Sequence, residues 1–236
     1  MRKSKLSGSD SNPQGDENLE IMRFAPRYTT HVGKLIAKQI PVEGRILELG
    51  SGDGLQTSKI ISPQGRFICI EQSLIQAQSL KSLGYQVSQD LTAHIASNSS
   101  VLFSLNCLEH IEDDLGILRT IHECLAPAGR VVLYVPALPM LFSNMDRHVG
   151  HYRRYTRKSL SAALFQAGFQ VRSFEYVDSI GVITSLIYRF LPFASGKPSP
   201  KSIVFYDTLF FPISRLFDIA LRRFAGKNLL IIGERA

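Results

Sequence analysis

Residues 45–54 read RILELGSGDG, and this stretch decides the fold. The apolar run at 46–49 is typical of a short buried strand in a parallel sheet. Gly50, Gly52 and Gly54 follow it at alternate positions. Because glycine has no Cβ, such a segment can turn sharply and bring its backbone close to a ligand. We therefore predict a strand that runs into a glycine turn and then into a helix.

Glu48 interrupts the apolar run one residue before the predicted strand ends. A buried carboxylate is costly unless it accepts hydrogen bonds. The position therefore indicates a side chain that either fixes the glycine turn or contacts a cationic ligand. On both interpretations, the turn forms the floor of a cofactor site.

Strand-like and helix-like segments alternate through the first 135 residues. The strand-like segments lie at 45–49, 66–71, 85–89, 101–105 and 130–135. The helix-like segments lie at 21–40, 55–62, 74–83 and 113–125. This alternation predicts a parallel sheet with helices on both faces. In such sheets, ligands bind at the carboxyl ends of the strands.

The rest of the chain is organised differently. Residues 136–158 contain two prolines and a cluster of His, Arg and Tyr, which indicates a long loop over the site. We predict a helix at 159–167, a strand at 169–177 and a closing strand at 228–233. Residues 178–227 then form an insertion between the last two strands.

The composition fits one large α/β domain, residues 21–236, behind a polar tail at 1–20 that we predict to be disordered. The three cysteines are scattered, which indicates buried core residues in a reducing compartment. No apolar signal segment is visible at the start, and no uncharged apolar run reaches the length of a membrane span. We therefore expect a cytoplasmic protein.

The net charge of +7 is unevenly distributed. Residues 1–130 carry 13 Lys and Arg against 14 Asp and Glu, whereas residues 131–236 carry 14 against 6. The second half therefore holds the basic excess. This indicates either an anionic substrate or surface near that half, or a solvated basic face.

The glycine turn differs from a dinucleotide site. The dinucleotide fingerprint is G-x-G-x-x-G, and it places a pyrophosphate at the start of a helix. Here the spacing is Gly50-x-Gly52-x-Gly54, and the charge of Asp53 repels phosphates. A cofactor with a positive centre and no phosphate fits the turn better.

Four segments, ILELGSGDG, FICIE, YQVSQD and LNCLEHIEDD, resemble class I S-adenosyl-L-methionine-dependent methyltransferases in their order and spacing. The resemblance covers residues 25–177 and the closing strand. The later segment ALPMLFSNMDRHVGHYRRYTRKSL is similar to a bacterial-type, uncharacterised subgroup of small-molecule methyltransferases. The resemblance implies a Rossmann-like doubly wound sheet of seven strands, mostly parallel with an antiparallel last strand.

The resemblance also implies a binding site for S-adenosyl-L-methionine. It places Glu48 by the methionine amino group, and Glu71 on the two ribose hydroxyls. It places Asp90 on the adenine amino group, with Leu91 beside the ring. The remaining implied contacts come from Gly50, Ser51, Gly52, Gly54, Gln72 and Asn106. Glu71 has an alternative role as an exposed acid at a strand end, and Asp90 has one as a turn former.

Methyl transfer from a sulfonium is an in-line displacement, and a base is needed only if the acceptor must lose a proton. His151 is our preferred candidate for this base. His110 is a second candidate, with an alternative role at the start of a helix. Asp146 and His148 lie in the same loop. We predict no metal ion.

The sequence GHYRRY also suggests contacts with the acceptor. Arg153 and Arg154 can clamp a phosphate or carboxylate, or they can form a solvated basic loop. Tyr152 and Tyr155 can line the acceptor pocket, or they can pack the loop.

Residues 178–227 leave four interpretations open: a lid over the acceptor, an amphipathic element on a membrane surface, a homodimer interface, or core packing. We rank the acceptor lid first and contact with a lipid-linked acceptor second. The predicted function is methyl transfer to a small-molecule or lipid- or sugar-linked acceptor, and the basic second half favours an anionic one. A non-catalytic cofactor-binding or interaction protein is the alternative. A nucleic acid partner is not expected, because only the basic half favours it.

Overall fold

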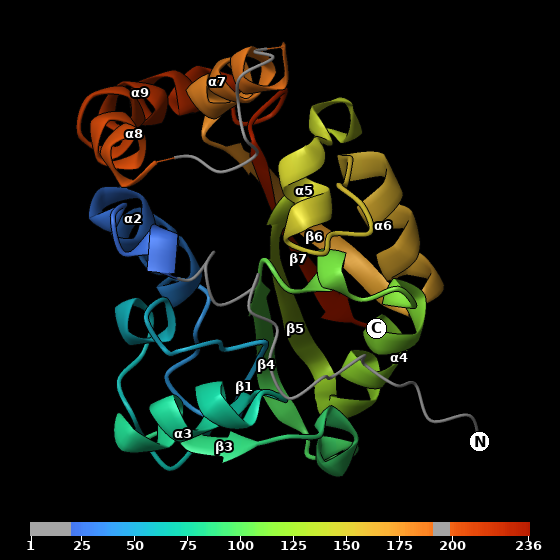
Figure 1. Ribbon diagram of the computed structural model, residues 1–236. Coiled ribbons are helices and arrows are strands. Elements are labelled where there is room, and N and C mark those ends of the chain that lie inside the picture. Colours follow the sequence, from blue (N-terminus) through green and yellow to red (C-terminus); the bar gives the residue numbers. More distant parts are fainter. Residues whose placement is uncertain (1–19, 191–198) are drawn as a thin grey trace.

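The computed structural model describes residues 20–190 and 199–236, and in this part of the chain seven strands form one sheet (Figure 1). The strand order is β3-β2-β1-β4-β5-β7-β6. All neighbours from β3 to β5 pair parallel, whereas β7 pairs antiparallel with β5 and β6. The predicted Rossmann-like sheet with an antiparallel last strand is confirmed. The strands are β1 Ile46–Leu49, β2 Phe67–Ile70, β3 Gln86–Ser88, β4 Ser99–Leu105, β5 Leu125–Pro136, β6 Phe169–Val177 and β7 Asn228–Arg235.

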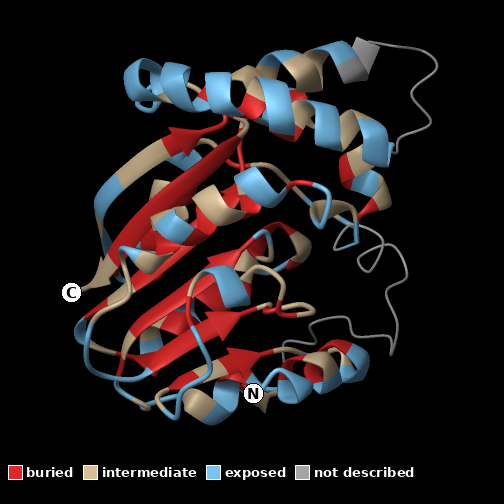
Figure 2. Ribbon diagram, turned by 90° about the vertical axis from the view of Figure 1, so that its left-hand side faces the viewer, coloured by how far each residue is buried: buried red, intermediate tan, exposed pale blue. Residues whose placement is uncertain are grey.

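Helices cover both faces of this sheet (Figure 1). Helices α2 and α3 pack on one face, where Ile36 and Leu80 are fully buried. Helices α4 and α6 pack on the other face with Leu118 and Leu160. The central strands β1 and β4 are buried on both sides, and Figure 2 shows the middle of the sheet in red. The helices are α2 Pro26–Ala37, α3 Leu74–Ser82, α4 Asp114–Cys124, α5 Asn144–His148, α6 Arg157–Gln166, α7 Ser179–Phe190, α8 Pro200–Phe205 and α9 Phe211–Leu221.

Side chains cap several of these helices at the places where the sequence changes character. Ser73 accepts the backbone N–H of Gln76 at the start of α3. Asp113 accepts the N–H of Gly116 at the start of α4. Such caps satisfy backbone donors that have no partner within the helix, so they fix where each helix begins.

The helix predicted at 55–62 was wrong. In the structure, this segment contains only the one-turn 3-10 helix η1, Thr57–Lys59. The window between Gly54 and Pro63 is short, and Thr, Ser and Ile, which are moderate helix formers, fill most of it. The predicted helix at 21–40 is also shorter, since α2 begins at Pro26.

The segment predicted as a long loop, 136–158, contains the 3-10 helix η4, Pro139–Leu141, and helix α5. Residues 178–227 contain α7, α8, the π-helix η5 (Tyr206–Phe210) and α9. These helices pack with one another, with α2 and with η4 after β5. They therefore lie at the carboxyl ends of the strands (Figure 1). Residues 1–19 of the tail predicted as disordered lie outside the described residues, as do residues 191–198 within the insertion.

Candidate active site

The glycine turn after β1 has the geometry that its sequence predicts. Gly50, Gly52 and Gly54 have φ angles of 75°, 56° and 85°. This left-handed region is costly for residues with a side chain. A Cβ at Gly50 would lie 2.5 Å from the Sγ of Cys107. The turn therefore packs its backbone directly against the segment that follows β4.

Glu48 lies beneath the turn with 2% of its surface exposed. The hydroxyl of Thr57 donates to its Oε2 over 2.8 Å. Burial raises the pKa of Glu48 to about 7, although the hydrogen bond from Thr57 opposes this. The sequence offered no signal for Thr57 as the partner of this carboxylate.

Glu71 follows β2 and binds the turn from the other side. Its Oε2 accepts the N–H of Gly52 over 2.8 Å, and its Oε1 accepts the N–H of Ser73 over 2.9 Å. The carboxylate therefore connects the glycine turn to the start of α3. Each carboxylate oxygen has a second acceptor site, so hydroxyl groups of a ligand can still bind.

The other predicted cofactor residues lie at the same edge of the sheet. Asp90 accepts the N–H and the hydroxyl of Thr92, which makes it the cap of the 3-10 helix η2, Leu91–His94. Leu91 is buried and Gln72 is exposed. Ser51 is buried in the turn, where its hydroxyl lies 3.5 Å from the Glu48 carbonyl oxygen.

Asn106 directly follows β4 and has a φ of 46°. Its N–H donates to the Tyr134 carbonyl over 2.8 Å, which holds it in place. A left-handed non-glycine residue costs free energy, and such residues gather at ligand sites.

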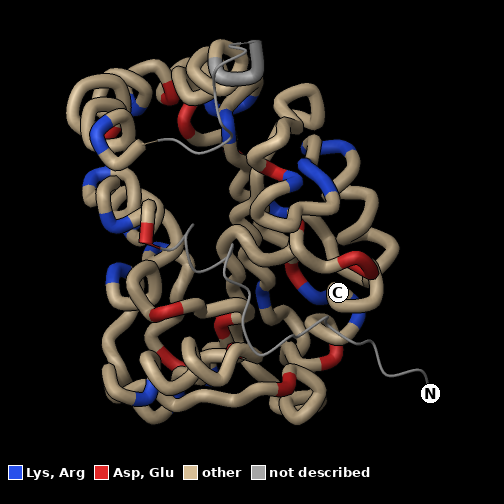
Figure 3. The backbone as a smooth tube through the Cα atoms, viewed as in Figure 1, with Lys and Arg blue, Asp and Glu red and all other residues tan. Residues whose placement is uncertain are grey.

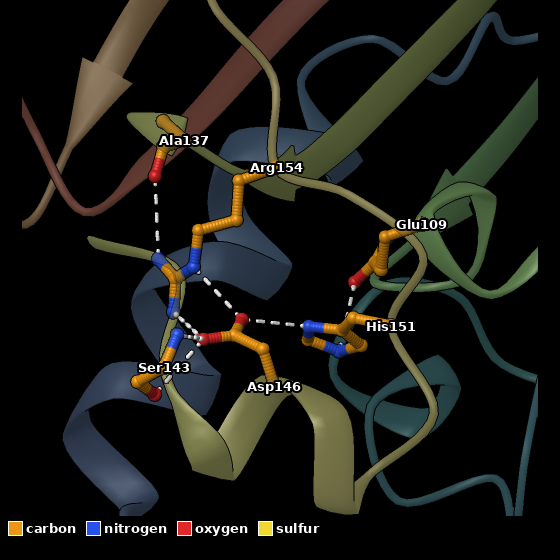
Figure 4. Close-up of polar contacts among 6 residues, drawn as sticks. All are labelled: Glu109, Ala137, Ser143, Asp146, His151 and Arg154. Carbon is orange, nitrogen blue, oxygen red and sulfur yellow. Dashed lines mark hydrogen bonds and ion pairs between the residues drawn. The ribbon is translucent and has the colours of Figure 1, made fainter. Parts of the chain in front are cut away.

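A second cluster combines Asp146, His151 and Arg154 with Glu109 (Figure 4). The ring Nδ1 of His151 lies 2.9 Å from Asp146 Oδ1. Arg154 donates to both oxygens of Asp146, over 2.8 and 3.2 Å, and also to the carbonyl of Ala137. Ser143 donates its N–H and its hydroxyl to Asp146 Oδ2.

These contacts determine which nitrogen of His151 carries a proton. Burial alone would raise the pKa of Asp146, but the hydrogen bond from His151 and the charge of Arg154 hold it well below its usual range. An ionised carboxylate can only accept, so Nδ1 of His151 is the donor. The free lone pair of the neutral ring is then on Nε2, which lies 3.8 Å from Glu109 Oε1.

Glu109 is fully buried, and neither of its oxygens has a hydrogen-bond partner in the described part of the chain. Burial raises its pKa to about 8. His110 contacts the ring of His151 edge to face, with 4.6 Å between centroids, and burial lowers its pKa to about 4. At neutral pH burial therefore favours the protonated form of Glu109.

The four residues predicted to bind the acceptor are placed differently from one another. Arg153 binds Asp114 over 2.9 Å and donates to the carbonyls at 111 and 112. The hydroxyl of Tyr155 donates to the same Asp114. Arg154 is bound to Asp146, whereas Tyr152 is 48% exposed. Only Tyr152 of this set presents a large free surface.

A family model described as a methyltransferase domain matches residues 21–173. The chain belongs to the class I S-adenosyl-L-methionine-dependent methyltransferases. No curated protein matches the sequence.

Solved structures agree with this fold. A methyltransferase of Haloferax volcanii, in complex with the activator Trm112, is 13% identical over 99% of both chains, with a TM-score of 0.59. A methyltransferase from Thermotoga maritima is 14% identical over 94% of this chain and 95% of that one, with a TM-score of 0.61. A phosphoethanolamine N-methyltransferase from Haemonchus contortus, with S-adenosylhomocysteine, is 15% identical over 87% and 52%, with a TM-score of 0.56.

The residues of this methyltransferase fit its cofactor. Glu48 is a buried acceptor suited to an ammonium group, and the glycine turn leaves its backbone uncovered. Asp53, within the turn, is paired with Arg23 over 2.7 Å. The assignment of each contact to a part of the cofactor stays a prediction.

The site of this methyltransferase also contains side chains that could bind a metal ion. One ligand atom each from Glu109, His110 and His151 lies within 4.8 Å of the others. In the cluster of Figure 4, however, Arg154 pairs with the buried carboxylate of Asp146, and burial favours the neutral, protonated form of Glu109. We therefore interpret the group as a site for a proton.

The sequence analysis did not identify Glu109 as a neighbour of His151, although the sequence contains an indication of it. The residue is an acid between the apolar Leu108 and the candidate base His110. Because its partner His151 is 42 positions away, only the fold brings them together.

Proposed function

We propose that this chain transfers a methyl group from S-adenosyl-L-methionine to a small-molecule or lipid- or sugar-linked acceptor. The observation that best supports this is the contact of Gly50 with Cys107. It joins the glycine turn to the segment that carries Glu109 and His110, so the cofactor site and the proton site are adjacent.

The cofactor residues act by position. Glu48 accepts from the methionine amino group, Glu71 accepts from the ribose, and Asp90 with Leu91 holds the adenine. The bound cofactor supplies a sulfonium with an activated methyl group, so positioning and exclusion of water carry much of the catalysis. The remaining contacts come from Gly50, Ser51, Gly52, Gly54, Gln72 and Asn106.

His151 is the base in this proposal. Its Nδ1–H donates to Asp146, which fixes Nε2 as the proton acceptor. An acceptor hydroxyl would lose its proton to Nε2 as its oxygen takes the methyl group. An ammonium group would lose its proton to Nε2 first, because its nitrogen has no lone pair to accept the methyl group. The resulting imidazolium is stabilised by Asp146, and Glu109 lies on the Nε2 side. His110 packs edge to face on the ring and keeps it in this orientation.

The HYRRY segment binds the acceptor in this proposal, and its residues have two different roles. Tyr152 is exposed and contacts the acceptor directly. Arg153, Arg154 and Tyr155 are occupied by internal partners, so they shape the pocket by holding the loop.

Calorimetric titration with S-adenosyl-L-methionine and S-adenosyl-L-homocysteine tests the proposal. We expect micromolar binding of both ligands to the wild-type chain and to the exposed control Glu43→Gln. Absence of binding to a folded sample would overturn it. Binding without turnover on a panel of hydroxyl and amine acceptors would favour a non-catalytic cofactor-binding protein.

A further inference from the structure

The helices α8 and α9, with η5 between them, present an apolar surface to solvent. Of the twenty large hydrophobic residues that are exposed in the described part of the chain, nine lie between residues 204 and 224. Contiguous apolar patches of this kind mark interaction sites in soluble proteins. We call these residues the outer face: Val204, Phe205, Leu209, Ile213, Leu216, Phe217, Ile219, Leu221 and Phe224.

The inward side of the same helices combines the buried Phe211, which packs on Tyr28, with several buried polar side chains. Asp207 is buried and accepts the N–H groups of Arg27 and Tyr28 at the start of α2. Asp218 accepts the N–H groups of Asp178 and Ser179 over 2.9 and 2.8 Å. Polar contacts therefore attach these helices to the domain, and Figure 2 shows their exposed residues on the outside of the molecule.

A third contact of this type comes from Ser214, which is fully buried. Its hydroxyl donates to Asp178 over 2.9 Å, as does that of Tyr206 over 2.5 Å. The hydrogen bonds to Asp178, Asp207 and Asp218 fix the orientation of the helices. Their apolar residues are thus held outward by the fold.

The charges on this segment are also divided between the two sides. Lys201, Arg215, Arg222 and Arg223 are exposed. The only two acids between residues 200 and 224 are Asp207 and Asp218, and both are engaged inward as described above. Figure 3 shows the basic positions on these helices. The outer face therefore combines apolar side chains with cations and with no outward acid.

The combination of apolar side chains and cations on the outer face favours one kind of binding partner over another. In a two-fold symmetric dimer through this face, two sets of Arg215, Arg222 and Arg223 would lie close together. The repulsion between these like charges would oppose the dimer. An anionic bilayer accepts both components, since it buries the apolar side chains and attracts the cations. None of the described helices is long and apolar enough to cross a membrane, so the contact is with one surface.

We propose that the outer face docks this methyltransferase on the surface of an anionic phospholipid bilayer. Asp207 ties this segment to the start of α2, and α7 contacts η4 just after β5. Docking therefore places the carboxyl ends of the strands near the headgroups. The use of docking to reach a lipid-linked acceptor rests on the proposed function, whereas the docking itself does not.

Binding is measured by co-sedimentation of the full chain with vesicles of phosphatidylcholine alone or of phosphatidylcholine mixed equally with phosphatidylglycerol. We expect binding to the mixed vesicles only, weakened by salt. Each cation at such a surface contributes about a fivefold gain in affinity, so the triple variant Arg215→Gln/Arg222→Gln/Arg223→Gln should bind about 100-fold more weakly. The charge-matched control Lys81→Gln/Arg119→Gln/Lys158→Gln should bind like the wild type.

A fluorescence reporter tests the apolar part separately. The chain contains no Trp, so Leu216→Trp introduces a single indole on the outer face, and Phe165→Trp does so at an exposed position on α6. Both positions are on the surface, so both variants should fold. Mixed vesicles should shift the emission of Leu216→Trp to shorter wavelength and leave that of Phe165→Trp unchanged.

Three results would overturn the proposal: no binding to mixed vesicles, equal binding by the two triple variants, or equal shifts at the two reporter positions. A dimer in sedimentation velocity that Leu216→Ser and Phe217→Ser abolish, with no vesicle binding, would assign the outer face to a second copy. Because these assays need no cofactor or acceptor, they are independent of whether methyl transfer occurs.

Discussion

Replacing Glu48 by Gln removes a carboxylate that the fold buries and the cofactor is proposed to need. Burial raises its pKa from the ordinary value of 4.5 to about 7. The folded chain therefore favours the protonated form. The stability that this group contributes is fully present below pH 4.5 and is lost as the pH rises through 7. Gln keeps an acceptor for the Thr57 hydroxyl without the charge.

The magnitude follows from the two pKa values. One pKa unit corresponds to about 1.4 kcal/mol, so the ionised carboxylate costs ~1 kcal/mol at pH 5 and ~3 kcal/mol at pH 8. Glu48→Gln should therefore stabilise the cofactor-free chain by these amounts. In a domain of this size, the unfolding midpoint should rise by ~2–4 °C at pH 5 and by ~6–12 °C at pH 8.

The assay is thermal unfolding at both pH values, with the exposed Glu43→Gln as control, followed by calorimetry with S-adenosyl-L-methionine. We expect a more stable variant that has lost most of its cofactor affinity, because Gln cannot neutralise the methionine ammonium. For the wild type, affinity should increase with pH up to about 7, where Glu48 ionises. A variant that is less stable, equally shifted at both pH values, or still able to bind the cofactor tightly would refute the reasoning.

Three further predictions concern the rest of the site. His151→Asn should lower kcat by ~10²–10⁴-fold with unchanged cofactor affinity. The control His122→Asn, at the far end of the sheet, should leave kcat unchanged. Equal losses of kcat in the two variants would contradict the role of His151 as the base. Gly50→Ala should lower the unfolding midpoint and weaken cofactor binding, because its Cβ would meet Cys107 Sγ at a positive φ, and an unchanged midpoint would count against this geometry. Chelators should leave turnover intact; a loss that Mg²⁺ or Zn²⁺ restores would assign Glu109 to a metal site instead.

Local sequence patterns predicted the elements around the glycine turn because their causes are local. The apolar run of β1 and the three glycines act within ten residues, and proline and glycine mark the neighbouring helix ends. The helix expected at 55–62 failed for a tertiary reason in addition to its propensity. Thr57, which is fully buried, directs its hydroxyl to Glu48 in place of continuing a regular helix.

The site itself needed contacts that sequence spacing does not encode. Arg153 and Arg154 are adjacent in sequence and were given one shared role. The fold separates them, since Arg153 binds Asp114 at the start of α4, and Arg154 binds Asp146 on α5. Two long cations with the same local context thus hold different parts of the loop.

The outer face illustrates a further limit of periodicity. The apolar residues at 203–224 recur at helical spacing, but periodicity alone does not say which face of a helix turns inward. Here Asp207, Ser214 and Asp218 face inward with the buried Phe211, and their hydrogen-bond partners come from α2, from Asp178 after β6 and from α7. Hydrogen bonds satisfy these polar side chains inside the protein, whereas the apolar side chains of the outer face remain in water. The proposed docking on an anionic bilayer would bury these nine apolar side chains, which the fold by itself leaves exposed.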